Sequence, residues 1–219
     1  MIRVEKLVEG AADLYVDTLA AVATALAASQ FSLAVERLQP IAGEVWHGRL
    51  SRTPSKVATP QTMKRDVTPR MRAEVYVRDR FRCTYCGGRV IPLPVLVAIS
   101  DVIPEGLPYH SYYKSGLIHP AYWFVVPEVD HALAHASGGT GELANLTTLH
   151  AACNALKAAA SITELPPVDR AGAVEGWDGL LSQYPGVVAA GELHGTRHHG
   201  DRYHSDWLRY FGLQPFGLT

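Results

Sequence analysis

The 219-residue chain has little cysteine, no long apolar run and no excess of charge of one sign. Three cysteines are too few, and of the wrong parity, for the disulfide framework of a small secreted protein. The best apolar stretch, Leu14 to Leu26, carries Asp17 and is shorter than the roughly 18 to 20 residues that a membrane span needs. The first residues mix both charge signs, unlike a signal peptide. We therefore expect a cytoplasmic protein without a membrane span.

The composition is that of a globular protein, because 47% of the residues are hydrophobic and 19% are charged. At roughly 150 residues per domain, the length fits one domain with large additions or two small domains. The net charge of −1 conceals an uneven distribution, because the sequence from Arg49 to Arg89 contains 11 Lys and Arg residues but only 3 acidic residues. This basic block suits either a phosphate-binding surface or a solvated linker.

Local patterns divide the chain into four parts. Residues 4–38 are rich in Ala and Leu with apolar residues at helical spacing, which predicts one long helix or a helical hairpin in an N-terminal helical region, 1–48. Residues 49–67 lack periodicity and form a basic linker or arm. Thr68 then has the character of a helix N-cap, and Pro69 that of a first helical residue.

The second half of the chain contains weaker patterns. Residues 121–129 have the composition of a strand, which ends in Asp130 and His131. A Gly-rich loop follows, and the Ala-rich residues 147–161 predict a helix. The C-terminal extension, 162–219, predicts a helix near residues 177–184 and a tail whose histidines we expect in solvent rather than on a metal: His194, His198, His199 and His204.

The cysteines and one histidine form two pairs of equal spacing. Two residues separate Cys83 from Cys86, and two separate His150 from Cys153, so every cysteine of the chain is used. Structural zinc takes four N or S ligands in a tetrahedron, usually from two such pairs. The two glycines after Cys86 permit the tight turn that lets two thiolates face one ion. We expect zinc, with free thiols or a redox pair as the alternative.

Further residues extend this pattern. A C-x-x-C pair, a D-H pair, a loop with two glycines, N-L, and a second pair followed by Asn and a later Lys occur here as CTYC, VDHALAHASGGTGELANL and HAACNALK. Their order and spacing resemble the HNH endonuclease family, in its form with a zinc-bound ββα-metal core. The resemblance covers Arg78 to Ala160. It implies an α+β fold in which an HNH nuclease domain, 68–161, has an N-terminal helical extension and a C-terminal helical tail.

The resemblance also implies a role for each matching residue. His131 is similar to the general base that activates a water, and Asn145 to the central Asn that holds the loop and orients this histidine. Asp130 and Asn154 resemble the ligands of one catalytic Mg²⁺ or Mn²⁺, which are hard cations that prefer oxygen. Lys157, one turn beyond Asn154, is placed to reach a phosphate. Apart from the resemblance, the basic block offers further phosphate-binding side chains in Arg78, Arg80 and Arg82.

The sequence departs from the family pattern in three places. Ala134 stands where the family usually has Pro, with His135 next to it, and the second zinc pair begins with His. About 43 residues separate Cys86 from Asp130, so we expect an insertion at about 87–127.

Three kinds of function remain open at this point. The first is a metal-dependent HNH endonuclease, a hydrolase that cuts phosphodiester bonds in DNA. The second is a zinc-ribbon module that binds DNA and has a vestigial nuclease site. The third is a protein-interaction module in which the N-terminal helices form a homodimer and the zinc only stabilises the fold.

Overall fold

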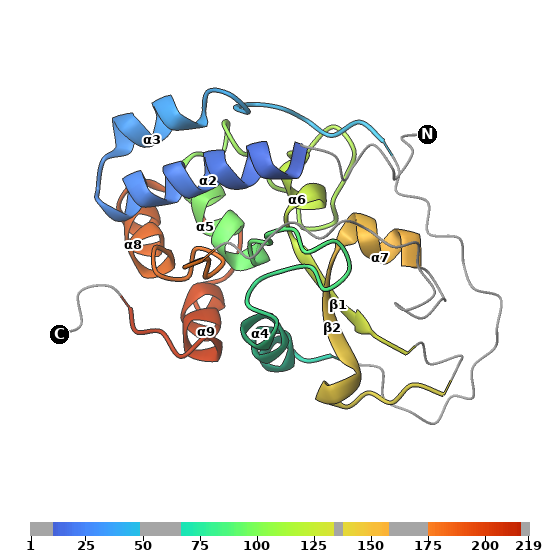
Figure 1. Cartoon of the computed structure of the whole chain (residues 1–219). Helices are drawn as coiled ribbons and strands as arrows, with labels where there is room; N and C mark the ends of the chain where they lie inside the picture. The colour runs from blue at the N-terminus through green and yellow to red at the C-terminus, as the bar shows by residue number, and fades with distance from the viewer. Residues whose placement is uncertain (1–10, 49–66, 134–137, 158–174, 216–219) are drawn as a thin grey trace.

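A computed structural model describes residues 11–48, 67–133, 138–157 and 175–215. In chain order the elements are α2 (Ala11–Ala27), α3 (Phe31–Leu38), α4 (Pro69–Arg78), α5 (Leu93–Val102), α6 (Ala121–Phe124), β1 (Pro127–His131), the 3₁₀ helix η2 (Leu143–Asn145), β2 (Leu146–His150), α7 (Ala151–Lys157), α8 (Tyr184–His194) and α9 (Tyr203–Tyr210). The described part is α+β, with helices around a two-stranded antiparallel sheet. Figure 1 shows α2, α3, α5, α8 and α9 gathered on one side and β1, β2 and α7 on the other.

The N-terminal region is a helical hairpin rather than one long helix. The chain reverses after α2 at Ser29, whose φ of 58° is left-handed. The apolar face of α2 is buried at helical spacing through Tyr15, Leu19, Val22 and Leu26. Because α2 packs against α3 and α8, this face is covered by other parts of the same chain.

The segment predicted as an insertion, 87–127, forms part of the core. Every residue of α5 from Pro94 to Val102 is buried, and the helix packs against α8, with further contacts to α2 and α9. The expectation of a strand over 121–129 was wrong for its first half. Residues Ala121–Phe124 form the short helix α6, which follows Pro120 in helical conformation, and the strand begins only at Pro127.

The sheet consists of β1 and β2, which run antiparallel with Glu128 opposite Leu149 and Asp130 opposite Thr147. The expected helix over 147–161 was wrong at its start, because residues 147–150 belong to β2. All five residues of β2 are buried, and pairing with β1 outweighs the helix propensity of the neighbouring alanines. The helix α7 follows without a loop, so the order of elements here is ββα.

The start of α4 is as predicted. The Thr68 side chain accepts a hydrogen bond from the backbone N–H of Met71 at 3.2 Å, and Pro69 is the first helical residue. At the other end of the chain, α8 begins at Tyr184, where the predicted helix was expected to end. In the part of the chain that the structure describes, no helix is both long and apolar enough to cross a membrane.

The histidines of the C-terminal tail are anchored rather than solvated. Those whose side chains the structure describes are half-buried: His198, His199 and His204. His204 Nε2 lies 2.9 Å from Asp101 Oδ2, and its Nδ1 lies 2.8 Å from the Tyr184 hydroxyl. His198 Nε2 lies 2.9 Å from Ser100 Oγ. Asp101 is buried at the end of α5 and needs hydrogen-bond partners, which these histidines provide.

Candidate functional site

The first cysteine pair lies in a tight turn that follows α4. The backbone N–H of Gly87 donates to the Cys83 carbonyl at 2.8 Å, and the N–H of Cys83 donates to the Gly88 carbonyl at 2.9 Å. Gly87 has a φ of 75°, which a residue with a side chain rarely adopts. A Cβ atom at Gly88 would lie 2.8 Å from Cε1 of His150. The two glycines therefore permit both the turn and the close approach of the histidine.

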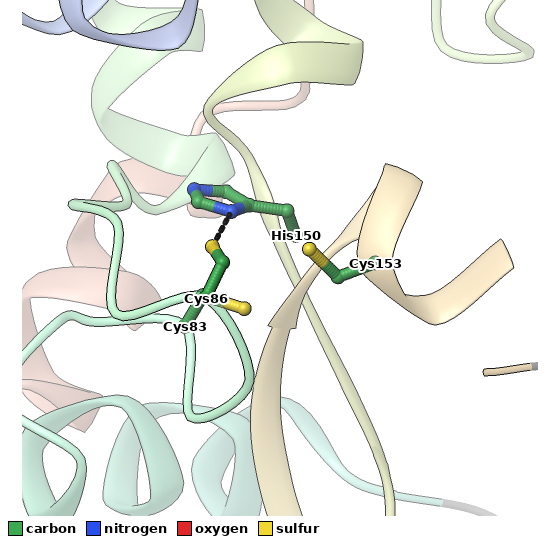
Figure 2. A group of neighbouring side chains, drawn as sticks. All are labelled: Cys83, Cys86, His150 and Cys153. Carbon is green, nitrogen blue, oxygen red and sulfur yellow. Dashed lines mark hydrogen bonds between the residues drawn. The ribbon is translucent and has the colours of Figure 1, made fainter. Parts of the chain in front are cut away.

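The four residues of the predicted zinc site come together from three elements. Cys83 and Cys86 lie in the turn, His150 ends β2 and Cys153 lies in α7, and Figure 2 shows their side chains pointing toward one another. All four are buried, and their ligand atoms lie within 4.8 Å of one another. Among the described residues they are the only group of three or more Cys, His, Asp or Glu side chains close enough together to hold one metal ion.

The His150 ring is oriented as in a metal ligand. Nε2 lies 3.0 Å from the carbonyl oxygen of Arg89, which can only accept, so Nε2 carries the proton. Nδ1 then faces the cluster, 3.3 Å from Cys86 Sγ (Figure 2). A second hydrogen bond that fixes the ring and its tautomer is the usual support for a histidine that binds metal.

Protons are shared among the four groups. Hydrogen bonds from Cys153 and Cys86 hold the pKa of the Cys83 thiol well below its usual range, and the hydrogen bond with Cys83 raises the pKa of Cys153. Burial disfavours the charged form of His150, but hydrogen bonds with Cys83 and Cys86 and their negative charge outweigh it and raise its pKa to about 10. The buried thiols of the cluster therefore carry negative charge, which a bound cation would stabilise.

A second group of polar residues lies between β1 and α7. Glu128 and Asp130 project from one face of β1, because side chains alternate along a strand. Asn154 and Lys157 lie three residues apart on one face of α7. The Asn154 amide donates to Glu128 Oε2, and Lys157 Nζ lies 2.9 Å from Asp130 Oδ2. The helix is thereby held on the strand by two polar pairs.

Lys157 and His131 both lie against Asp130. The Lys157 side chain is 1% exposed, so its ammonium group contacts this carboxylate rather than solvent. Nδ1 of His131 lies 3.8 Å from Asp130 Oδ1, and the histidine side chain is 13% exposed. The predicted base, one predicted metal ligand and one predicted phosphate-binding residue are therefore neighbours.

Asn145 holds the chain that follows His131. Its Oδ1 accepts from the Leu133 N–H at 2.9 Å, and its Nδ2 donates to the carbonyls of Leu133 at 3.1 Å and Thr140 at 2.7 Å. Its own carbonyl accepts from the N–H of Ala132 at 2.7 Å. Gly139 lies so close to Leu133 that a Cβ at this glycine would overlap the Leu133 carbonyl. Ala134 and His135 lie outside the described residues.

The arginines near the motif differ in their contacts, because Arg78 and Arg82 donate to backbone carbonyls whereas Arg80 is exposed. Arg78 donates to the carbonyls of Leu143 at 2.7 Å and Leu146 at 2.6 Å, which ties α4 to η2 and to the first residue of β2. Arg82 donates twice to the Gly87 carbonyl within the cysteine turn. Arg80 is exposed. Most of the basic arm, 49–66, lies outside the described residues.

Two carboxylates of the site were not singled out from the sequence. Glu128 stands two residues before Asp130, and strand alternation is the signal that places both on one face. Asp79 follows α4, accepts from the Thr148 N–H at 2.8 Å and pairs with Arg78 at 2.8 Å. Its only sequence signal is its position at the end of a predicted helix.

Comparison with protein-family models, with curated proteins and with solved structures finds no match to this chain.

Proposed function

We propose that the protein is a metal-dependent endonuclease of the HNH type, which hydrolyses phosphodiester bonds in DNA and uses structural zinc to hold its site together. The observation that carries this proposal is the ββα unit. Asp130 and His131 end β1, and Asn154 lies on the helix packed against this strand, one residue after a ligand of the Cys₃His cluster. A Cys₃His set supports zinc, since thiolate and imidazole are its preferred ligands in closed structural sites.

His131 is the proposed general base. An imidazole at the end of a strand, next to the Asp130 carboxylate, can accept a proton from a water that attacks phosphorus. Asn145 acts through the backbone, because its hydrogen bonds fix the two residues that follow His131. It is therefore a positioning residue rather than a catalytic one.

Asp130 and Asn154 are the proposed ligands of the catalytic cation, with Glu128 beside them. The fit is chemical: two carboxylates and an amide oxygen are the hard donors that Mg²⁺ and Mn²⁺ prefer. A bound cation would supply Lewis-acid stabilisation of the charge that develops on the phosphate.

The proposal is tested by cleavage of plasmid DNA with Mg²⁺, with Mn²⁺ and without divalent cation. His131→Ala should slow cleavage roughly 100- to 10,000-fold, because a positioned acid or base typically accelerates a reaction by that factor. The protein should keep its zinc and its fold, since His131 is no ligand of the cluster. His47→Ala is the matched control, because this histidine is exposed and lies outside the site. Metal-dependent cleavage by His131→Ala at the wild-type rate would reject His131 as the base.

One observation favours the second candidate, a zinc-stabilised DNA-binding module that does not cut. Lys157 neutralises Asp130 from a buried position, as a structural ion pair would. This candidate predicts that plasmid DNA is shifted on a gel but never cleaved with any divalent cation. It also predicts that His131→Ala and Asp130→Asn leave the DNA affinity unchanged.

A further inference from the structure

A cavity of about 540 Å³ lies beside the candidate site. Its volume is in the range of sites for small organic ligands. Residues of α4, α5, α6, β1, α7 and α9 line it, and its lining includes six aromatic side chains: Tyr76, Tyr112, Tyr113, Tyr122, Trp123 and Trp207. None of the roles assigned above uses these side chains.

The aromatic walls are held in place. The Tyr76 hydroxyl donates to the Pro127 carbonyl at 3.0 Å, and the Tyr122 hydroxyl donates to the Leu96 carbonyl at 3.3 Å. The ring of Tyr113 meets Trp123 edge to face, with centroids 4.9 Å apart. Tyr112 differs, because 88% of it is exposed and it stands at the rim. Fixed rings inside and an exposed ring at the rim suit a flat aromatic ligand.

One side of the cavity is polar and is shared with the candidate site. Glu128 lines it, and the same carboxylate accepts the hydrogen bond of Asn154. Ala151 and Ala155 of α7 also line it, so Asn154 lies between cavity residues in the sequence. Asp130 is two residues from Glu128, roughly 7 Å along the strand. A ligand in the cavity would therefore lie next to the residues proposed to cut the DNA backbone.

We propose that this cavity receives a single nucleobase turned out of the DNA strand. The inference rests on the proposed nuclease function and adds how the substrate is held. Enzymes that extrude a base hold it by stacking on aromatic rings and by hydrogen bonds to its edge, which are the two kinds of group present here.

Glu128 and Arg72 determine which nucleobases this pocket prefers. A carboxylate accepts hydrogen bonds and Arg72 donates them, so the polar side matches a base with both N–H groups and acceptors on its edge. Adenine, cytosine and guanine carry an exocyclic amino group for Glu128, whereas thymine does not. The hydrogen-bonding groups of the pocket therefore favour an amino-bearing base.

Binding of free deoxynucleosides tests the pocket without any cleavage. The zinc-loaded full chain is titrated with deoxyadenosine, deoxycytidine, deoxyguanosine and thymidine, without added Mg²⁺, and binding is followed by saturation-transfer NMR. At least one amino-bearing deoxynucleoside should bind saturably and about tenfold more tightly than thymidine. Absence of saturable binding by all four overturns the inference.

Two exposed positions on one segment provide a matched pair of variants. Ser111 lines the cavity and Lys114 does not, and both are exposed. Ser111→Trp should fill the pocket and weaken deoxynucleoside binding at least tenfold, while Lys114→Trp should bind as the wild type does. Equal binding by the two variants overturns the inference. Ser111→Trp should also slow plasmid cleavage, and Lys114→Trp should not.

The two proposals fail in different ways. DNA cleavage without deoxynucleoside binding, and with Ser111→Trp as active as the wild type, overturns the pocket and leaves the nuclease standing. Deoxynucleoside binding by a protein that never cuts DNA overturns the nuclease, and with it the role of the pocket in holding a substrate for cleavage.

Discussion

Thr147 and Thr148 are neighbours in β2, and both are buried, yet their hydroxyl groups differ in their contacts. Thr147 Oγ1 lies 2.6 Å from the hydroxyl of Thr84 in the cysteine turn. Thr148 Oγ1 is buried and makes no hydrogen bond within the described part of the chain. A buried hydroxyl without a partner costs stability, whereas a paired one contributes to it.

Replacement of each threonine by valine should therefore change stability in opposite directions. Valine has nearly the same shape, so the hydroxyl is the main difference. Thr148→Val should raise the free energy of unfolding by about 1 kcal/mol, and Thr147→Val should lower it by about 1 kcal/mol. Urea unfolding measures both, read as the midpoint at unchanged slope. A loss of stability in Thr148→Val would mean that its hydroxyl has a partner.

At the scale of elements, Arg78 joins α4 to the segment that leads into β2. It contacts the carbonyls of Leu143 and Leu146 and the Asp79 carboxylate, which in turn holds the Thr148 N–H. Arg80 is exposed two residues later. The two arginines therefore have different tasks, although both belong to the basic block.

Glutamine at each position separates the structural task from phosphate binding. Arg78→Gln should lower the free energy of unfolding by about 1 to 2 kcal/mol, because charged hydrogen bonds to backbone are lost from a side chain that is 43% exposed. Arg80→Gln should stay within about 0.5 kcal/mol of the wild type. If Arg80 binds a phosphate, its loss should flatten the salt dependence of DNA binding by about 0.9, and Arg78→Gln should not. Equal salt slopes in the wild type and Arg80→Gln would assign Arg80 to the solvated surface.

The elements also show what a sequence can reveal. The start of α4 was predictable, because Thr68 and Pro69 act locally through capping and a fixed φ. The start of β2 was not, because residues 147–150 are strand only through pairing with residues of β1 that lie 17 to 23 positions earlier. The helix α5 was missed for a related reason. Its residues are apolar except for Ser100 and Asp101 and are buried on all sides, so no period distinguishes a buried helix from a buried strand.

The candidate site was predictable where spacing decides the chemistry. The equal spacing within the two zinc pairs predicted a four-ligand cluster, and the structure brings these four residues together. Glu128 was missed, because a lone carboxylate in a strand is ordinary until its contact with Asn154 is seen. The contact of Lys157 with Asp130 was missed as well, since a lysine in a helix usually points to solvent. Contacts across elements, unlike spacing within one, have no signal in a single sequence.

At the scale of the whole molecule, the Cys₃His cluster connects parts of the chain about 70 residues apart. It joins the turn after α4 to the junction of β2 and α7. From the same turn, Arg89 pairs with Asp13 at 3.2 Å and Asp17 at 2.8 Å in α2. The cluster therefore supports the position of β1 and α7 and, through Arg89, that of the N-terminal hairpin.

Loss of one ligand should thus act on the whole fold. The purified protein should carry about one zinc per chain, and Cys153→Ser should lose it together with more than about 4 kcal/mol of stability. Ala152→Ser is the control, because it places the same hydroxyl one residue away, at a buried position that is no ligand. It should keep the zinc and cost about 1 to 3 kcal/mol. Elemental analysis and thermal unfolding decide this, and well-folded wild-type protein without zinc would contradict it.

The burial of α5 has a consequence for how the protein is made. The chain leaves the ribosome from its N-terminus, and α5 is complete at Val102, whereas α8, which packs along it, begins only at Tyr184. At about 5 to 20 residues per second, this separation corresponds to roughly 4 to 16 s of translation. During that time the most apolar helix of the core is without its main partner. Nascent chains released before residue 184 should therefore depend on chaperones and be prone to aggregate.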